Sequence, residues 1–264
     1  MKQINHQEIM EYSLEILRRF DMLCSEHGLR YSVAYGTMIG CVRHHGYIPW
    51  DDDIDVIMPR SDYEKLLKLK FHEGDFEIRH YSYTDGYFYP FAKMTNNGFL
   101  LCENNRCEKD MGIFIDIFPL DFIPCNEDFI KIEKSTKKHG EKLLLLGLSK
   151  FDPNRSLFNR IKRISFYCLI NPLRKILLKL GEQKFYCAES NGSDLLMNQF
   201  FIVKKGKCHS IKDWDSIIRM KFENIEVSVL SNYDAILRGI YGDYMKLPPV
   251  EEQVSPHQIK VWKK

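Results

Sequence analysis

The sequence predicts an α/β (α+β) fold in which helices flank a mixed β-sheet and a helical segment is inserted or appended. Three observations support it. An amphipathic helical pattern opens the chain, short apolar runs interrupted by aspartate indicate strands, and a Lys-rich helical pattern occupies the middle. A length of 264 residues with 44% hydrophobic content is ample for a sizeable core. The net charge of +2 offers no general nucleic-acid footprint, so we expect no nucleic-acid partner.

The first predicted element is a helix that runs to about residue 27. Asn5 and Glu8, three positions apart, form a candidate capping box, and Gly28 is placed to end the helix. Its apolar stripe consists of Ile9, Ile16, Phe20 and Leu23. A stripe of this spacing is expected to pack on the sheet.

An acidic stretch follows, with aspartate at positions 51, 52, 53 and 55. Asp53 and Asp55 alternate with Ile54 and Val56, so on a strand both carboxylates would project from one face and both aliphatic side chains from the other. Hard oxygen ligands on one face favour Mg²⁺. A calcium loop is excluded because it needs glycine where Val56 stands. A solvated acidic turn stays as the alternative.

The segment before the acidic stretch predicts an anion site. Residues 31–35 are typical of a short strand, and Gly36 and Thr37 open a segment with helical spacing. A strand that turns through glycine into a helix N-terminus exposes backbone N–H groups to phosphate. Followed by Asp53 and Asp55, the turn would place a phosphate cradle beside a metal site.

Further elements follow in chain order. Ser61 and Glu64 form a second candidate capping box that opens a helix. Residues 76–102 are expected to be strands joined by turns, with Lys93 either pointing into a phosphate site or standing as a solvated strand lysine. Residues 113–119 form a strand apolar on both faces except for Asp116. A buried strand rarely carries a lone carboxylate unless it is paired or binds metal.

The middle of the chain, from about residue 127, is helical and basic. Within residues 155–181, basic side chains alternate with apolar turns, among them Arg160, Lys162, Arg163, Arg174, Lys175 and Lys179. This segment is either a solvated helical hairpin or a helix in the membrane interface. Residues 198–230 again favour strands, and residues 233–241 a short helix.

The motif that joins these parts runs from Gly36-Thr37 through Arg43 to Trp50-Asp51-Asp52-Asp53-Ile54-Asp55-Val56. A Gly-Thr turn before an Asp-x-Asp strand is the arrangement of the nucleotidyltransferase superfamily. The full motif resembles the LicD family of phosphocholine transferases, whose core pattern is shared by fukutin-type phosphoalditol transferases. The similarity recurs at residues 116–121 and at residues 241–245.

The resemblance implies a nucleotidyltransferase-like core over residues 1–125, a helical, basic segment over residues 126–215 facing acceptor or membrane, and a completing strand and helix over residues 216–264. It also implies an activity. A Mg²⁺-dependent enzyme, with Mn²⁺ as the alternative ion, would move phosphocholine from CDP-choline to a glycan or lipid-linked oligosaccharide hydroxyl and release CMP. The acceptor would be a precursor of lipopolysaccharide, teichoic acid or capsule.

The resemblance and the residue patterns above together assign the site residues, with Lys93 assigned from its place in the strand. Asp53, Asp55 and Asp116 would be catalytic and hold the metal, with Asp116 as ligand or general base. The substrate-binding residues would be Gly36, Thr37, Arg43, Asp51 and Lys93. An aromatic cage suits the quaternary ammonium of choline, and Trp50 and Tyr89 are candidates for it.

Other readings stay open. The chain could use a CDP-alditol, could be a true nucleotidyltransferase acting on a sugar, or could be a non-catalytic glycan-binding module. The polar N-terminus and the lack of about eighteen consecutive apolar residues predict a cytoplasmic protein, soluble or peripheral at the inner face of the membrane. Eight scattered cysteines predict free thiols, with a zinc site at Cys102 and Cys107 as the alternative.

Overall fold

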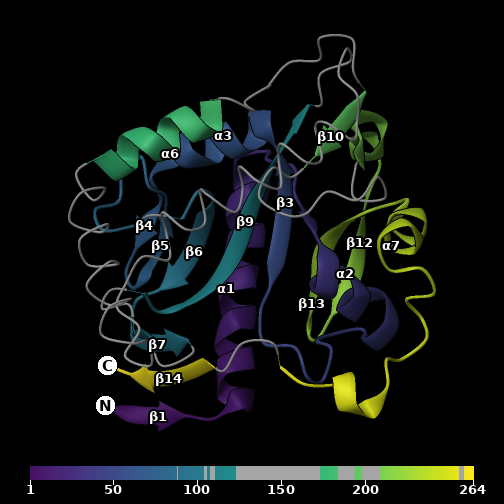
Figure 1. Cartoon of the computed structure of the whole chain (residues 1–264), viewed down its shortest axis with the longest axis horizontal. Helices are drawn as coiled ribbons and strands as arrows, with labels where there is room; N and C mark the ends of the chain where they lie inside the picture. Colours follow the sequence, from purple (N-terminus) through teal and green to yellow (C-terminus); the bar gives the residue numbers. More distant parts are fainter. Residues whose placement is uncertain are drawn as a thin grey trace, which may run out of the picture.

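The computed structural model describes residues 1–87, 89–103, 106–107, 111–122, 173–183, 194–197, 209–255 and 259–264. Its main feature is a mixed sheet flanked by helices (Figure 1), which confirms the predicted fold class. Strand β9 (Ile113–Phe122) lies at the centre, parallel to β3 (Asp55–Pro59) and antiparallel to β6 (Ala92–Asn96). The remaining strands of this sheet are β2 (Ser32–Val33), β4 (His72–Glu73), β5 (Phe76–Arg79), β10 (Leu195–Met197) and β11 (His209–Ser210).

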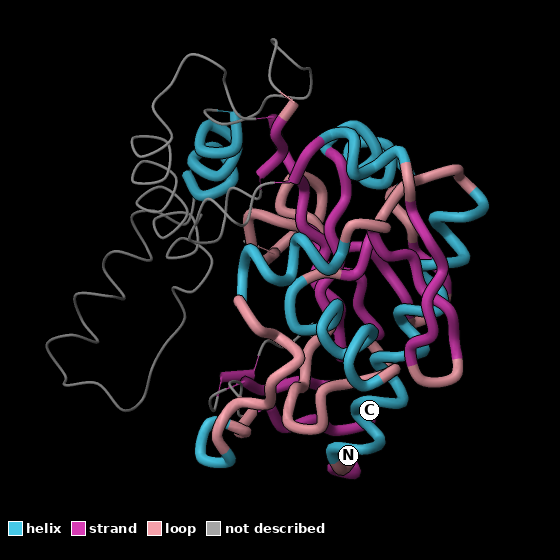
Figure 2. The backbone as a smooth tube through the Cα atoms, turned by 90° about the vertical axis from the view of Figure 1, so that its right-hand side faces the viewer, coloured by secondary structure: helices cyan, strands magenta, loops and turns pink. Residues whose placement is uncertain are grey.

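A second sheet brings the two ends of the chain side by side (Figures 1 and 2). Its order is β1 (Lys2–Ile4), β14 (Ile259–Lys263), β7 (Phe99–Glu103) and β8 (Arg106–Cys107). Strands β12 (Ile217–Phe222) and β13 (Ile225–Leu230) form a separate hairpin. The predicted strand content of residues 76–102 is confirmed.

Helix α1 (His6–Glu26) confirms the first predicted element. The Asn5 side chain accepts from the Glu8 backbone N–H, and the Glu8 side chain accepts from the Asn5 N–H, as in a capping box. The apolar stripe of α1 is buried against the sheet together with Val56 of β3 and Ile115 of β9. Burial of that stripe holds the helix on one face of the sheet.

The opposite face of the sheet packs against a different helix. Side chains that alternate along β9, including Phe118 and Leu120, share an apolar cluster with Leu178 of α6 (Arg174–Gln183). The helical prediction is confirmed for α6. Residues 123–172 lie outside the described part of the chain. Strand β10 extends the core sheet beside β9, and the division at residues 125 and 215 stays a prediction. In the described residues, no helix is long and apolar enough to cross a membrane.

Three local predictions are corrected. Strand β2 covers only Ser32–Val33, because Tyr35 already begins α2 (Tyr35–Ile39). The capping box at Ser61 is wrong. Helix α3 (Arg60–Leu69) begins directly after Pro59, which cannot donate to a strand ladder and is the residue preceding the helix. Asp53 precedes β3 rather than lying within it, although Ile54 and Val56 are buried as the alternation predicted.

The cysteines are also partly corrected. Cys24 and Cys41 are free, as expected, and both are buried. Cys102 is instead disulfide-bonded, so the prediction of free thiols is wrong there. Strands β7 and β8 place Cys102 opposite Cys107 in their antiparallel pair. A disulfide-bonded sulfur cannot serve as a zinc thiolate, which removes the predicted zinc alternative at Cys102.

Candidate active site

The predicted catalytic carboxylates come together through the register of the central strands. Asp55 of β3 lies directly opposite Asp116 of β9 in the parallel pair. Lys93 of β6 lies opposite Asp116 on the other side, and its ammonium forms an ion pair with the Asp116 carboxylate. Three residues predicted separately are therefore neighbours across three adjacent strands.

The loop before β3 adds further carboxylates. Asp51, Asp52 and Asp53 each have one carboxylate oxygen within 4.8 Å of the others. Asp52 is turned toward the C-terminal part of the chain, where the Ser255 hydroxyl donates to it. Asp51 and Asp53 instead interact with Asp55 by charge, so the acidic cluster at the site consists of Asp51, Asp53, Asp55 and Asp116.

The electrostatics of this acidic cluster favour a bound cation. Burial raises the pKa of Asp55 well above its ordinary value, and the charges of Asp53, Asp116 and Asp51 raise it further, while Lys93 lowers it. Burial, followed by Asp53, raises the pKa of Asp51 to about 7. Carboxylates forced together in this way are stabilised by a cation, and their oxygen atoms are the ligands that Mg²⁺ prefers. The donor set therefore fits Mg²⁺, although the choice of ligands stays a prediction.

The Gly36-Thr37 turn supports the acidic cluster directly. A Cβ atom on Gly36 would lie 2.6 Å from Oδ2 of Asp51, so only glycine permits this close approach. The Asp55 backbone N–H donates to Oγ1 of Thr37 at 2.9 Å, which fixes the start of β3. The predicted contact of this turn with a phosphate stays a prediction.

Lys93 is held in an aromatic setting. Its Nζ lies 3.5 Å from the ring centroid of Phe114, 4.8 Å from that of Tyr89 and 5.2 Å from that of Phe91. With only 3% of its surface exposed, it is not the solvated strand lysine of the alternative reading. Aromatic faces and the Asp116 carboxylate together stabilise its positive charge beside the acidic cluster.

Arg43 connects the site to the C-terminal part of the chain. It lies in a π-helical turn (Gly40–His44), and its Nη1 donates to the Tyr244 carbonyl oxygen at 2.6 Å. Its Nε donates to Nε2 of His44 at 2.9 Å, and the His44 ring packs edge-on against Trp50. The predicted role of Arg43 toward donor phosphates stays a prediction.

Tyr241 lies at the candidate site, although the sequence indicated it only as part of the similarity at residues 241–245. It ends helix α7 (Tyr233–Tyr241), which confirms the predicted helix, and 44% of its surface is exposed. Burial and then the charges of Asp55, Asp51 and Asp53 raise the pKa of its phenol, so the hydroxyl group lies within electrostatic range of the acidic cluster. No local pattern marks this role, because α7 is more than a hundred residues from the other parts of the site in sequence.

Comparison with known proteins decides the family. A model of the LicD/FKTN/FKRP nucleotidyltransferase domain matches residues 28–147, which include the whole acidic cluster. The lipopolysaccharide cholinephosphotransferase LicD of Haemophilus influenzae is 30% identical over 98% of both chains. The chain belongs to the LicD family.

This LicD-family chain also resembles two uncharacterised rickettsial proteins over shorter stretches. One, from Rickettsia typhi, is 27% identical over 43% of this chain and 35% of its own length. The other, from Rickettsia prowazekii, is 31% identical over 21% of both chains. The family is one of transferases, so the prediction that the chain is an enzyme is confirmed.

Proposed function

We propose that this LicD-family enzyme is a Mg²⁺-dependent phosphotransferase that moves phosphocholine from CDP-choline to a hydroxyl group of a surface glycan precursor. The observation that carries the proposal is the placement of Asp55 opposite Asp116, with Lys93 paired to Asp116 from the next strand. The similar protein of Haemophilus influenzae acts on lipopolysaccharide, which makes that glycan the first acceptor to test ahead of teichoic acid or capsule.

Asp53 and Asp55 would hold Mg²⁺, with Asp116 either as a third ligand or as the general base, and Asp51 would serve as a further ligand or as an acceptor for the hydration shell of the ion. A bound ion would supply positive charge to the donor diphosphate. Gly36 permits the close approach of the Asp51 carboxylate. Thr37 accepts a hydrogen bond from the Asp55 backbone N–H and so fixes the position of Asp55. Mn²⁺ has the same preference for oxygen ligands and is the alternative ion.

The reaction needs one nucleophile and one leaving group. The acceptor hydroxyl oxygen bonds to the phosphorus next to choline, the bond from that phosphorus to the CMP oxygen breaks, and CMP leaves. As the general base, Asp116 would take the hydroxyl proton; the ion pair with Lys93 holds its carboxylate in place on the central strand. Lys93 and Arg43 supply positive charge toward the donor phosphates.

The choline group needs an aromatic surface near negative charge. Tyr241 meets both conditions, because its side chain is half-exposed and its hydroxyl group lies within electrostatic range of three carboxylates. Tyr89 already contacts the Lys93 ammonium, and Trp50 packs against His44 and the core. We therefore place the choline ammonium at Tyr241.

The test is a transfer assay with CDP-choline carrying one label in choline and another in cytidine. With Mg²⁺ and deacylated lipopolysaccharide from Haemophilus influenzae as acceptor, the choline label should enter the glycan and the cytidine label should appear as CMP. Asp55→Asn should abolish transfer, whereas Asp215→Asn, on an exposed residue far from the site in sequence, should not. Entry of the cytidine label would establish a nucleotidyltransferase, and transfer only from a CDP-alditol would establish the other alternative.

Asp116→Asn separates the two roles of that carboxylate. As the general base, Asp116 should matter for turnover, so the variant should bind CDP-choline normally and react at least about a hundredfold more slowly. Weaker binding of Mn²⁺, measured by electron paramagnetic resonance, would instead make Asp116 a metal ligand.

Peripheral membrane contact is proposed for residues 155–181, of which the structure describes only the last part. There, Leu173, Ile176 and Leu180 are exposed beside Lys175 and Lys179. Each basic residue near an anionic leaflet is worth about 1 kcal/mol. The protein should sediment with vesicles containing phosphatidylglycerol at low salt and not at high salt, and failure at low salt would refute the contact.

A further inference from the structure

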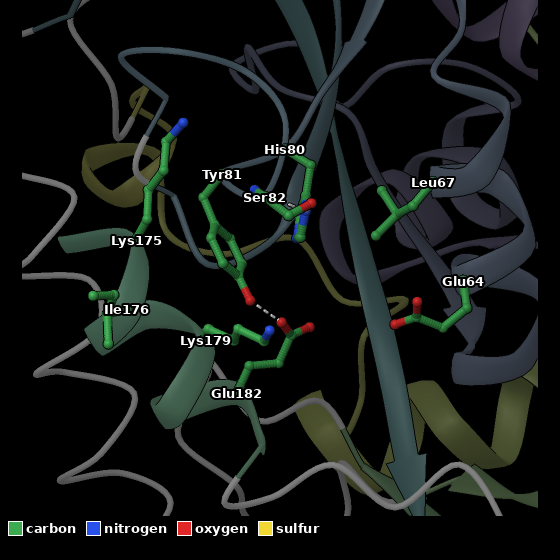
Figure 3. Close-up of a pocket in the computed structure, with 9 residues that line it drawn as sticks. All are labelled: Glu64, Leu67, His80, Tyr81, Ser82, Lys175, Ile176, Lys179 and Glu182. Carbon is green, nitrogen blue, oxygen red and sulfur yellow. Dashed lines mark hydrogen bonds between the residues drawn. The ribbon is translucent and has the colours of Figure 1, made fainter. Parts of the chain in front are cut away.

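Away from the acidic cluster, a pocket of about 480 Å³ lies between helices α3 and α6 (Figure 3). Glu64 and Leu67 line it from α3, Ile176, Lys179 and Glu182 line it from α6, and the segment after β5 contributes Tyr81. Its volume is in the range of small-ligand sites. None of these residues belongs to the acidic cluster.

The pocket lies on the same face of the sheet as the catalytic carboxylates. Along β9, Asp116, Phe118 and Leu120 alternate with residues that face α1, so these three side chains share the other face. Phe118 and Leu120 pack in one cluster with Tyr81 and with Leu178 of α6. Leu120 is four positions after Asp116 along the strand, which corresponds to about 13 Å.

Helix α6 is fixed over this face by a buried ionic network. The Arg60 guanidinium donates to Oε1 of Glu182 at 2.7 Å and to both carboxylate oxygens of Asp121. The Tyr81 hydroxyl also donates to Glu182, from inside the pocket (Figure 3). Hydrogen bonds and ion pairs therefore fix the position of α6 and of the side chains that form this part of the pocket wall.

His80 adds a buried ring nitrogen to the lining. Its Nδ1 lies 2.8 Å from the Ser82 hydroxyl oxygen, which can either donate to it or accept from it. Burial lowers the pKa of His80 to about 4, which keeps the ring neutral. Its Nε2 is buried and has no hydrogen-bond partner among the described residues. A ligand hydroxyl, which can donate or accept, would remove the cost of this unsatisfied buried nitrogen.

The charges around the pocket oppose an ionic ligand of either sign. Glu64 and Glu182 share the Arg60 guanidinium with Asp121, so carboxylates outnumber the guanidinium there. On the α6 side, Lys175 and Lys179 supply positive charge, and Lys175 is also paired with Asp85. An anion would meet the carboxylates and a cation would meet the lysines. A neutral ligand with many hydroxyl groups can donate to the carboxylates and accept from Lys179.

We propose that this pocket is a subsite for a sugar unit of the acceptor glycan, away from the hydroxyl that reacts. A sugar ring carries hydroxyl groups at its edge and an apolar C–H face, which match the polar groups above and the surface of Tyr81, Leu67 and Ile176. The inference rests on the proposed function for its choice of glycan. Binding energy from a remote sugar unit would orient the acceptor at the acidic cluster.

The test measures binding without transfer. The probe is deacylated lipopolysaccharide oligosaccharide from Haemophilus influenzae, titrated into the full chain by saturation-transfer NMR and calorimetry. Ile176→Trp fills the pocket from a side chain that is 56% exposed, and Leu180→Trp makes the same change one helical turn away at a side chain that is 59% exposed and does not line the pocket. Lys179→Met removes a donor without adding bulk.

Ile176→Trp, which occupies the space of the sugar, and Lys179→Met, which removes a hydrogen bond from a charged group, should each weaken oligosaccharide binding at least about tenfold. Leu180→Trp should bind like the parent protein, and all three variants should bind CDP-choline equally. The proposed sugar subsite would be refuted if the parent protein did not bind the oligosaccharide, or if the Ile176→Trp and Leu180→Trp variants bound it equally. If oligosaccharide binding follows this pattern while CDP-choline is neither bound nor used, the pocket stands and the proposed function fails.

Discussion

Asp51→Asn should stabilise the protein when no metal is bound. Asp51 stands against Asp53 near Asp55, and burial and these charges raise its pKa from 3.8 to about 7. An asparagine keeps the shape of the side chain and removes one charge from the acidic cluster. The substitution therefore isolates the cost of holding that charge in the folded, metal-free protein.

The size of the effect follows from the change in pKa. A difference of one in pKa corresponds to about 1.4 kcal/mol, so the rise from 3.8 to about 7 corresponds to about 4 kcal/mol at high pH. Because the folded carboxyl holds its proton more tightly than the unfolded one, the stability that it contributes is complete below pH 3.8 and is lost as the pH rises toward 7. The Asp51→Asn variant lacks this carboxyl, so its stability does not fall with rising pH for this reason.

The assay is urea unfolding of both proteins in EDTA at pH 4, 6 and 8. The variant should match the parent protein within about 0.5 kcal/mol at pH 4 and exceed it by about 2 to 4 kcal/mol at pH 8. Mg²⁺ should then stabilise the parent protein more than the variant, because binding to the folded state alone raises stability. Asp215→Asn is the control and should show no such dependence on pH. A variant advantage that is the same at pH 4 and pH 8, or a less stable variant at pH 8 in EDTA, would refute the reasoning.

Three further predictions concern other parts of the fold. Gly36→Ala should change the free energy of unfolding by less than about 1 kcal/mol, since alanine suits a helix, while displacing Asp51 and slowing transfer at least about tenfold; unchanged turnover would contradict this. Asp121→Asn should cost about 3 kcal/mol in urea unfolding, because Arg60 is 1% exposed and would keep a buried charge with fewer partners, and a loss under about 1 kcal/mol would contradict it. Burial lowers the pKa of His209 to about 4, and neither ring nitrogen has a hydrogen-bond partner among the described residues. Stability from this neutral ring is present above pH 6.5 and lost toward pH 4, so His209→Leu should gain about 3 kcal/mol on the parent protein between pH 7 and pH 4, and parallel pH profiles would contradict it.

Local pattern was enough to predict several elements of the fold. The Asn5 and Glu8 capping box and the apolar stripe of α1 are set by residues within a few positions of one another, and both are present. The alternation of Ile54 and Val56 with aspartate correctly predicted which side chains are buried. Asp116 stood out because a carboxylate in an apolar strand needs a partner, and it has one in Lys93.

Two of the corrected predictions concern residues that contact distant parts of the chain. Pro59 ends β3 and begins α3 earlier than the pattern at Ser61 suggested, and Arg60 is then buried against Asp121 and Glu182, far along the chain. Cys102 is disulfide-bonded in a strand whose partner strand was not predicted from local sequence.

The candidate site shows the same division. The sequence by itself predicted the carboxylates of the candidate site, because their spacing and their residue types are typical of metal binding. Only the tertiary structure decided that Asp55 faces Asp116 and that Tyr241 lies within electrostatic range of Asp55. It also decided that the turn at Gly36 admits the Asp51 carboxylate. These contacts depend on strand register and on the packing of segments far apart in the chain, and neither leaves a periodic signal in the local sequence.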